Sequence, residues 1–373
     1  MNWVNRRYFL MGSMGAAVAT RRARSQAGGA PIGTGMIGVG GRGTADLRAV
    51  LAQSGVKVNA LCDLKPDRLD KAASLASAHK PATFKDYHEL VARKDVEAVF
   101  IATPCDLHVE MAIAALKAGK HVYCEKPAGI NAESIQRLID VVHVSGRVFQ
   151  IGQQMRSMSR LRQTVDQIHE GVVGDVIMIK AARTASADLP HDSSSADWFF
   201  DAKRSGDVIV EMSVHNLDEC NWVTGSHPDR AGGFGGTLLW KNDPPGRTNM
   251  DGYTVSYDYV NGIKLSYTQM FFHPTGMPGG GQPTYIYGTK GAVDLGTATA
   301  YSLDRGVKPV VLAEPVHEDP NAHQAAFFES IRTGARSPAD ISVAATAALT
   351  AILGREAIYT RQVTTWAGLG VRI

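Results

Sequence analysis

The sequence predicts an α/β fold with two domains, of which the first is a doubly wound parallel sheet. Short apolar runs alternate with segments of helical periodicity from residue 32 to residue 152, which is the pattern of strand–helix–strand units in a parallel sheet. A glycine-rich turn, G-V-G-G-R-G, lies at the first strand-to-helix junction. With 373 residues, the chain also exceeds the length that one hydrophobic core usually supports.

The first predicted strand, residues 32–39, leads into the glycine-rich turn, and residues 44–51 continue with helical periodicity. In a G-x-G-x-x-G motif, Gly38 permits the tight turn, Gly40 lets the backbone approach a pyrophosphate, and Gly43 allows close packing of helix on strand. The N-terminus of the helix supplies N–H donors and a favourable dipole for phosphates. The sequence therefore predicts a dinucleotide-binding site at this turn.

A second predicted strand, residues 56–62, ends in Asp63, which follows the turn by about 20 residues. A carboxylate at this place accepts hydrogen bonds from the hydroxyls of an adenosine ribose, and it repels a 2′-phosphate. The sequence thus favours NAD over NADP as the cofactor, although the nearby cations Lys65 and Arg68 weaken this preference.

The alternation continues with a strand at 96–102, a helix at 108–118, a strand at 121–124, a helix at 132–144 and a strand at 148–152. Ligands of doubly wound sheets bind beyond the carboxyl ends of the strands. Asp63, Thr103 and Lys126 all follow such ends, so Lys126 is expected beside a nicotinamide ring. Lysine serves well as a proton shuttle when burial or neighbouring positive charge lowers its pKa. Taken alone, the step Glu125-Lys126-Pro127 would fit a surface turn with a solvated lysine.

The N-terminus is the most basic part of the chain. Its first 27 residues hold five arginines and no acidic residue, and without them the formal net charge of +3 becomes −2. The remaining body is not basic, so nucleic acid is not an expected partner.

Residues 5–11, N-R-R-Y-F-L-M, resemble a twin-arginine export signal. A weakly apolar stretch, too short to predict a membrane span, and a small-x-small cleavage pattern at 25–27 follow it. We therefore expect residues 1–27 to be a signal segment of a periplasmic or otherwise extracytoplasmic protein, folded with its cofactor before export. The alternative is a disordered extension of a cytoplasmic protein.

No metal site is predicted. The four cysteines, Cys62, Cys105, Cys124 and Cys220, lack metal-ligand spacing such as C-x-x-C. No convincing metal spacing of His, Asp and Glu occurs either, and the cysteines do not suggest a disulfide framework.

The order and spacing of five motifs make the chain similar to the Gfo/Idh/MocA family of oxidoreductases from about residue 32 to about residue 367. The motifs are G-V-G-G-R-G at 38–43, A-T-P at 102–104 with His108, E-K-P at 125–127, G-Q-Q-M-R at 152–156 and E-M-S-V-H-N-L-D at 211–218. The resemblance implies a Rossmann dinucleotide-binding domain at 32–150. It also implies a substrate-binding and oligomerisation α/β domain at 151–373 with a large, mostly antiparallel sheet.

In such proteins one face of the second sheet carries the active site, and the other commonly forms an oligomer interface. A homo-oligomer, either a dimer or a tetramer, is therefore expected. The final predicted helix, residues 343–359, is expected to pack back on the first domain.

The last motif holds the expected proton acceptor. Glu211 and His215 are four positions apart, so they share one face if the segment is helical. The family pattern has Asp at the first position, and Glu211 keeps the carboxylate with one more methylene. At neutral pH His215 can take a hydroxyl proton, and Lys126 can hydrogen-bond a developing alkoxide. Glu211 can orient His215 or bind a neighbouring hydroxyl.

The predicted site residues fall into three groups. The catalytic residues are Lys126, His215 and Glu211. The cofactor-binding residues are Gly38, Gly40, Gly41, Arg42, Gly43, Asp63, Thr103, Pro104, His108, Glu125 and Lys126. The substrate-binding residues are Arg156, Trp198, Asn216 and Asp218. Substrate binding by Arg156 and Trp198 has an equal alternative in each case, an ion pair for Arg156 and core packing for Trp198. The loop residues His191, Asp192 and His273 either line a carbohydrate site or are solvated.

Three functions fit these features. The first is an NAD(P)-dependent oxidoreductase that moves hydride between a carbohydrate or polyol hydroxyl and a tightly bound nicotinamide cofactor. The second is an NAD-dependent glycosidase that works by transient oxidation, elimination, hydration and re-reduction. The third is a non-catalytic, nucleotide-holding carbohydrate sensor. Its only support is that Glu211 stands where the family pattern has Asp.

Overall fold

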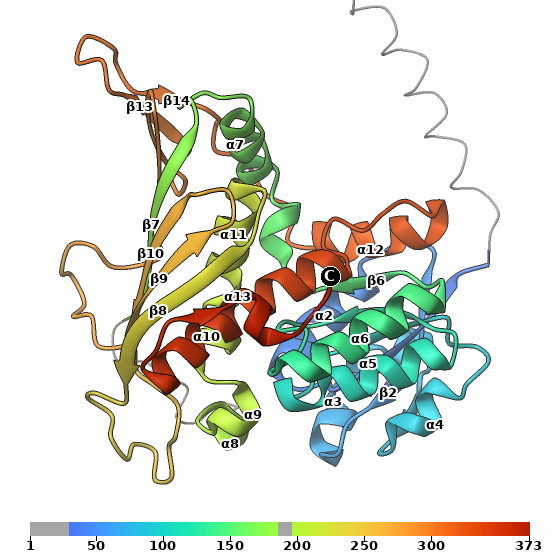
Figure 1. Cartoon of the computed structure of the whole chain (residues 1–373). Helices are drawn as coiled ribbons and strands as arrows, with labels where there is room; N and C mark the ends of the chain where they lie inside the picture. The colour runs from blue at the N-terminus through green and yellow to red at the C-terminus, as the bar shows by residue number, and fades with distance from the viewer. Residues whose placement is uncertain (1–29, 186–195) are drawn as a thin grey trace, which may run out of the picture.

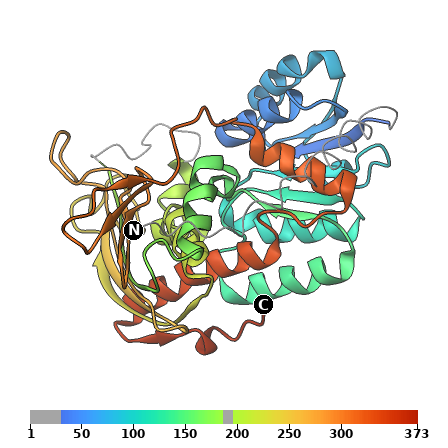
Figure 2. The same cartoon turned by 90° about the horizontal axis from the view of Figure 1, so that it is seen from above.

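The computed structural model describes residues 30–185 and 196–373, and it contains two sheets, A and B, with helices packed on them (Figures 1 and 2). Sheet A is built from the first half of the chain and sheet B from the second. The predicted fold class, a doubly wound parallel sheet followed by an α/β domain with a large, mostly antiparallel sheet, is confirmed. The expected signal segment, residues 1–27, and the loop residues His191 and Asp192 lie outside the described residues.

Sheet A has six parallel strands in the order β3-β2-β1-β4-β5-β6. The strands are β1 Ile32–Ile37, β2 Val56–Cys62, β3 Ala82–Phe84, β4 Ala98–Ile101, β5 His121–Cys124 and β6 Phe149–Ile151. The helices between them are α2 Gly41–Leu51, α3 Pro66–Leu75, α4 Tyr87–Val91, α5 His108–Lys117 and α6 Ala132–Ser145, with short 3₁₀ turns at Ser77–His79 and Cys105–Leu107. The strand order reverses beside β1, which creates a crevice at the carboxyl ends of β1 and β4.

Helix ends in this half show why the site opens where it does. Helix α6 begins where Asn131 Oδ1 accepts the Ser134 N–H at 2.8 Å, and it ends at the left-handed Gly146. Helix α2 instead starts after Gly40, and no side chain caps its first turn. Its N-terminal N–H groups therefore face the crevice without a side-chain partner, as an anion site requires.

Sheet B has nine strands in the order β14-β13-β12-β11-β7-β10-β9-β8-β15, and its neighbours are antiparallel except for the parallel pair β7 and β10. The strands are β7 Val176–Thr184, β8 Pro228–Gly236, β9 Gly252–Tyr259, β10 Lys264–Met270, β11 Thr284–Gly288, β12 Gly291–Asp294, β13 Thr299–Ser302, β14 Val310–Val311 and β15 Thr364–Thr365. Along β9 and β10 buried residues alternate with more exposed ones, so one face of the sheet packs on helices.

The remaining helices are α7 Ser159–His169, α8 Ala196–Phe199, α9 Ala202–Ser205, α10 Val208–Glu211, α11 Val214–Thr224, α12 Ala322–Thr333 and α13 Ile341–Thr360, with 3₁₀ turns at Gln154–Ser157 and Ala367–Leu369. Helix α12 packs on sheet A (Figure 2), where Phe327 and Phe328 join the buried cluster around Phe100 and Tyr123. Helix α13 contacts α6 and β6 of the first half and α11 and β8 of the second. These two helices therefore tie the halves of the chain together.

Helix α13 is also long and apolar enough to cross a membrane by length and composition, with a mean hydropathy of 1.4. However, 72% of that stretch is buried inside the protein. Its apolar residues are used in the hydrophobic core, as the contacts with both halves indicate.

Candidate active site

A cavity of about 1050 Å³ lies at the carboxyl edge of sheet A and extends to α8 and α10 of the second half. Its lining includes the predicted residues Gly38, Gly40, Gly41, Arg42, Asp63, Thr103, Pro104, His108, Glu125, Lys126, Trp198 and Glu211. Residues that sequence reasoning placed at a cofactor and at a substrate therefore share one cavity. Its volume suits a large ligand such as a dinucleotide.

The glycine-rich turn has the close packing that the motif requires. A Cβ at residue 43 would lie 1.9 Å from Gly38 O, so the first turn of α2 touches the end of β1. Gly38 itself has φ +80°, where a Cβ would lie 2.6 Å from Ala102 O. The turn thus brings the N-terminus of α2 directly against the cavity.

Asp63 braces this turn from the end of β2. Its Oδ2 accepts the Val39 N–H and its Oδ1 accepts the Lys65 N–H, each at 2.9 Å. A carboxylate oxygen can accept more than one hydrogen bond, so both oxygens keep acceptor capacity for ribose hydroxyls. The cations Lys65, Arg68 and Lys85 also line the cavity.

Lys126 is ion-paired. Its Nζ donates to Glu211 Oε1 at 2.5 Å and to the backbone oxygen of Glu211 at 2.6 Å. The side chains are 16% and 14% exposed, so the pair is largely shielded from water. The contact joins the turn after β5 to the end of α10. It leaves Lys126 one N–H for a ligand.

Glu211 and His215 do not share one helical face, because α10 ends at Glu211 and α11 begins at Val214. The condition for a shared face, one helix through both positions, is therefore not met. Within the described part of the chain, no hydrogen bond joins these two side chains, and His215 Nδ1 is buried without a partner. Burial lowers the pKa of His215 well below its usual range, and the charges of Lys126 and Arg183 lower it further. His215 is therefore neutral at physiological pH, and unlike Lys126 and Glu211 it does not belong to the lining of the cavity.

Three of the four predicted substrate residues lie outside the lining of the cavity. Arg156 and Asp218 bind each other, with Nε–Oδ2 at 2.8 Å and Nη2–Oδ1 at 2.9 Å, and Asp218 is only 2% exposed. Asn216 is buried and donates to Gln282 Oε1 at 3.3 Å. Trp198 does line the cavity and also forms an edge contact with Phe199.

His108 is a bracing residue at the cavity wall. Its Nδ1 lies 2.8 Å from Pro127 O, and its Nε2 lies 2.9 Å from Thr103 O. The ring is 1% exposed, so its contacts with these carbonyls hold the chain after β4 against the chain after β5.

Some cavity residues carried no role in the sequence analysis. Gln154, Met212, Phe271 and Arg204 all belong to the lining. The amide Oε1 of Gln154 is buried and has no hydrogen-bond partner among the described residues, which fits a bound ligand that donates a hydrogen bond there. Gln154 lies inside the G-Q-Q-M-R motif, and that motif was its signal. Phe271 had no sequence signal.

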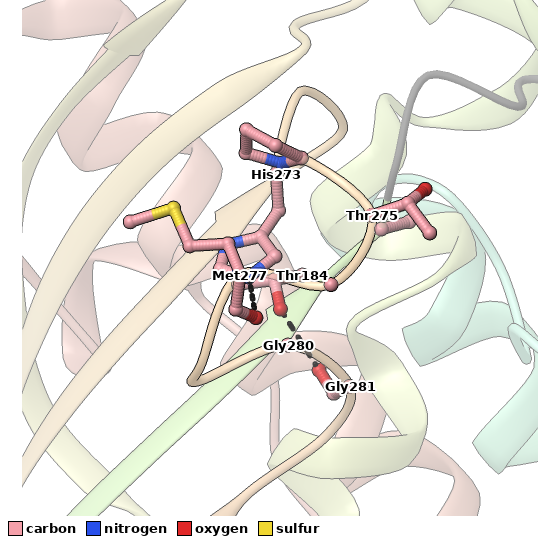
Figure 3. Close-up of a pocket in the computed structure, with 9 residues that line it drawn as sticks. Thr184, His273, Thr275, Met277, Gly280 and Gly281 are labelled. Carbon is pink, nitrogen blue, oxygen red and sulfur yellow. Dashed lines mark hydrogen bonds between the residues drawn. The ribbon is translucent and has the colours of Figure 1, made fainter.

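A second, smaller pocket of about 380 Å³ lies at the end of β7 (Figure 3). It is formed by Thr184 and by the loop that carries His273, Thr275 and Met277. His273 Nε2 lies 3.0 Å from Met277 O, so this ring nitrogen is engaged within the loop. Ala185 lines both this pocket and the larger cavity, and the two are therefore neighbours.

Across residues 30–185 and 196–373, no group of three or more His, Cys, Asp or Glu side chains is arranged to hold a metal ion. The four cysteines are buried and free.

The parallel sheet has an open α2 N-terminus, an acid at the end of β2 and a largely shielded lysine in one cavity, which together define a two-domain dinucleotide-dependent protein. The chain belongs to the Gfo/Idh/MocA family of oxidoreductases. Residues 32–153 match the model of the oxidoreductase family with an NAD-binding Rossmann fold, and residues 161–294 match the model of the GFO/IDH/MocA C-terminal domain. The cavity at sheet A is accordingly the site of an NAD-binding domain.

Several known proteins are similar to this chain. Inositol 2-dehydrogenase of Salmonella typhimurium (strain LT2) is 31% identical over 191 residues, which are 51% of this chain and 53% of that protein. A glycosyl hydrolase family 109 protein of Saccharopolyspora erythraea is 33% identical over 154 residues, which are 39% of this chain and 33% of that protein. The chain thus spans about half the length of the inositol dehydrogenases it matches.

A solved structure of levoglucosan dehydrogenase in complex with NADH has a TM-score of 0.77 with this chain and 20% identity. The match covers 90% of this chain and 99% of that one. At this identity the likeness concerns the fold alone.

Proposed function

We propose that the protein transfers hydride between a hydroxyl-bearing carbon of a carbohydrate or polyol and a nicotinamide cofactor. The observation that carries the proposal is the Lys126–Glu211 ion pair in the same cavity as the glycine-rich turn and Asp63. Trp198 adds an aromatic ring to this cavity, and apolar faces of sugars stack on such rings. The likeness to inositol dehydrogenases supports the substrate class.

Each side chain has a distinct role in this proposal. The bound nicotinamide supplies the hydride acceptor. Lys126 uses two N–H bonds on Glu211 and offers the third to the substrate oxygen, where it stabilises negative charge as the charge develops. His215 is the proposed acceptor of the hydroxyl proton, since its imidazole is unprotonated and its Nδ1 has no partner among the described residues. Gln154 accepts a hydrogen bond from the ligand through its unpartnered Oε1.

The experiment is a panel of sugars and polyols, inositols included, added to purified protein with NAD⁺, with reduced nicotinamide followed by absorbance. We expect reduction by at least one member of the panel. A protein with no bound nucleotide and no affinity for NAD(H) or NADP(H) would exclude the proposal.

A redox-cycling glycosidase is the second candidate, and the likeness to a glycosyl hydrolase family 109 protein favours it. In that reaction a transient ketone acidifies the adjacent C–H, the glycosidic substituent leaves, and hydride returns after addition of water. The same Lys126 and His215 would serve both steps. Cleavage of aryl glycosides without added NAD⁺ and without net NADH formation would favour the glycosidase over the dehydrogenase.

The twin-arginine-like segment supports a further proposal, that the protein is exported after folding. Its test is the location of the full chain in cell fractions, compared with an Arg6→Lys/Arg7→Lys variant. We expect the native chain outside the cytoplasm and the variant inside it. The native chain in the cytoplasm would refute export.

We also propose that the protein forms a homo-oligomer through sheet B. Tyr285 and Tyr287 of β11 are exposed, while their neighbours Thr284 and Ile286 are buried, and Met178 pairs with Tyr287 on β7. Exposed apolar groups in such a cluster are typical of interfaces. Light scattering should give a dimer or tetramer that Tyr287→Lys dissociates, and a monomeric native protein would contradict this.

A further inference from the structure

We propose that Glu125 is a positioning residue: it fixes the guanidinium of Arg42 at the phosphate end of the cavity and so joins that end to the Lys126 turn. The proposal deepens the proposed function, and it rests on it only in taking the cavity as the cofactor site. No hydride transfer is needed to test it.

Arg42 is the second residue of α2, and its side chain turns toward β5. Its Nε and Nη2 donate to Glu125 Oε1 at 2.9 Å and 2.8 Å, and Nη2 also lies 3.1 Å from Asp46 Oδ1. The Arg42 side chain is 41% exposed, whereas those of Glu125 and Asp46 are 6% and 1% exposed. One edge of the guanidinium is therefore held by buried carboxyl groups.

The Glu125 carboxyl group has little room to move. A Cβ at residue 152 would lie 2.6 Å from Glu125 Oε1, so Gly152 packs directly against it. The Tyr123 hydroxyl lies 3.4 Å from the same oxygen. Because the acceptor is fixed by β5 and by the chain after β6, it fixes the arginine that binds it.

Asp46 is the weaker partner of Arg42, because it receives only Nη2, at 3.1 Å. Burial raises its pKa to about 8, and the neighbouring Glu125 charge contributes to this rise. Its Oδ1 accepts a hydrogen bond from Gln324 of α12 at 3.0 Å, and its Oδ2 is buried with no partner in the described part of the chain. Glu125 holds the guanidinium more closely than Asp46 does, because its Oε1 receives both Nε and Nη2, and its loss would therefore release Arg42 most.

Arg42 also lines the cavity. It lies in the first turn of α2, and its contacts with Glu125 and Asp46 use Nε and Nη2 and not Nη1. This is where backbone N–H groups and the helix dipole favour a phosphate. A planar guanidinium with one edge held presents the other edge to a diphosphate in a fixed orientation.

Glu125 and Lys126 are neighbours in the chain but point to different partners. Glu125 binds Arg42 of α2, and Lys126 binds Glu211 of α10. One dipeptide thus connects the phosphate end of the cavity with the end where hydride transfer is proposed.

The test is a double-mutant cycle on the affinity for ADP-ribose, which has the diphosphate but no nicotinamide. We expect Glu125→Gln and Arg42→Ala each to weaken binding about tenfold. Adding Glu125→Gln to Arg42→Ala should change the dissociation constant by less than about twofold, because Glu125 acts only through Arg42. Glu329→Gln, at an exposed position of α12, is the matched control and should change nothing.

Equal weakening by Glu125→Gln in the native and Arg42→Ala backgrounds would overturn the proposal, as would native affinity in the single Glu125→Gln variant. If Glu125→Gln does not fold, Glu125→Asp takes its place in the cycle. Its side chain keeps the negative charge but is shorter by one methylene, so the carboxylate lies farther from Arg42. Thermal unfolding of the unliganded variants detects a purely structural effect of Glu125→Gln. Such an effect would be the same with Arg42 present and with Arg42→Ala. Failure of the native protein to bind any nucleotide would instead contradict the proposed function.

Discussion

Lys126 and Glu211 are 85 positions apart in the sequence, and their side chains meet with Nζ 2.5 Å from Oε1. The carboxylate comes from a position where the family pattern has Asp. Glu211 uses its carboxylate on Lys126, and His215 has no carboxylate partner in the described part of the chain. We therefore propose that Lys126 acts as a hydrogen-bond donor held in place by Glu211, and that His215 takes the proton.

Glu211→Gln should lower both activity and stability, because it leaves the Lys126 ammonium shielded from water without an anion. We expect a loss of about 1–3 kcal/mol in the free energy of unfolding and a fall of about 10²-fold in kcat. Glu211→Asp keeps the charge and should recover much of the activity. Denaturant unfolding and steady-state kinetics measure the two effects. Activity equal to the native protein in Glu211→Gln would show that the ion pair has no part in the reaction.

The acid limb of the pH profile should report His215. Its folded-state pKa lies below the ordinary value of about 6.5, so the proton acceptor is active above that lowered pKa and is lost as pH falls through it. We expect kcat/KM to stay level from pH 8 to below about pH 6.5. His215→Asn should remove this limb and lower kcat, while His143→Asn, on the exposed face of α6, should leave the profile unchanged. A limb that persists in His215→Asn belongs to another group.

Glu219 should make stability depend on pH. Burial and then the Asp218 charge raise its pKa to about 8 in the folded protein, whereas an unfolded glutamate titrates near about 4.3. The folded state thus binds more protons between these values, and its stability falls as pH rises through this window, by up to about 1.4 kcal/mol per pH unit.

Unfolding of Glu219→Gln between pH 5 and pH 8 tests this expectation. The variant should lose less stability over this range than the native protein does. Glu329→Gln, at an exposed position of α12, should behave as the native protein. Parallel pH curves for the native protein and Glu219→Gln would exclude the raised pKa.

Asp63 should set the choice between the two nicotinamide cofactors. Asp63→Ser removes the anion that repels a 2′-phosphate, while the cations Lys65 and Lys85 remain in the cavity lining. We expect weaker NAD binding and an affinity ratio shifted at least about tenfold toward NADP. Asp67→Ser, on the exposed face of α3, is the control. Titration calorimetry with both cofactors decides, and an unchanged ratio would mean that Asp63 does not face the 2′ position.

Strands with a continuous apolar pattern could be predicted from the sequence, and β2 and β5 lie at the expected residues. Strand β8 could not, because four of its nine residues are glycine. Two of its glycines are required by packing against β9: a Cβ at residue 235 would lie 2.3 Å from Tyr253 Cβ, and one at residue 233 would lie 2.5 Å from Thr254 O. This strand exists because it pairs with β9.

The cavity residues at strand ends were predictable, since parallel strands bring their carboxyl ends to one edge. The break between α10 and α11 was not, because it depends on sheet B. There Ser213 is held by the hydroxyl of Tyr267 at 2.9 Å and by a bond to Gln269. The mutual pairing of Arg156 and Asp218 likewise joins residues 62 positions apart and has no local signal.

The most direct test of the account is a single-turnover experiment with NAD⁺-loaded protein and the same sugar and polyol panel, in the native protein and in Lys126→Met. It detects the first hydride transfer of a dehydrogenase and of a redox-cycling glycosidase alike. At saturating NAD⁺ we expect reduced nicotinamide in the native protein and a rate lower by about 10²–10³-fold in Lys126→Met. Reduction at the native rate in Lys126→Met, or a bound cofactor that stays oxidised with every member of the panel, would contradict it.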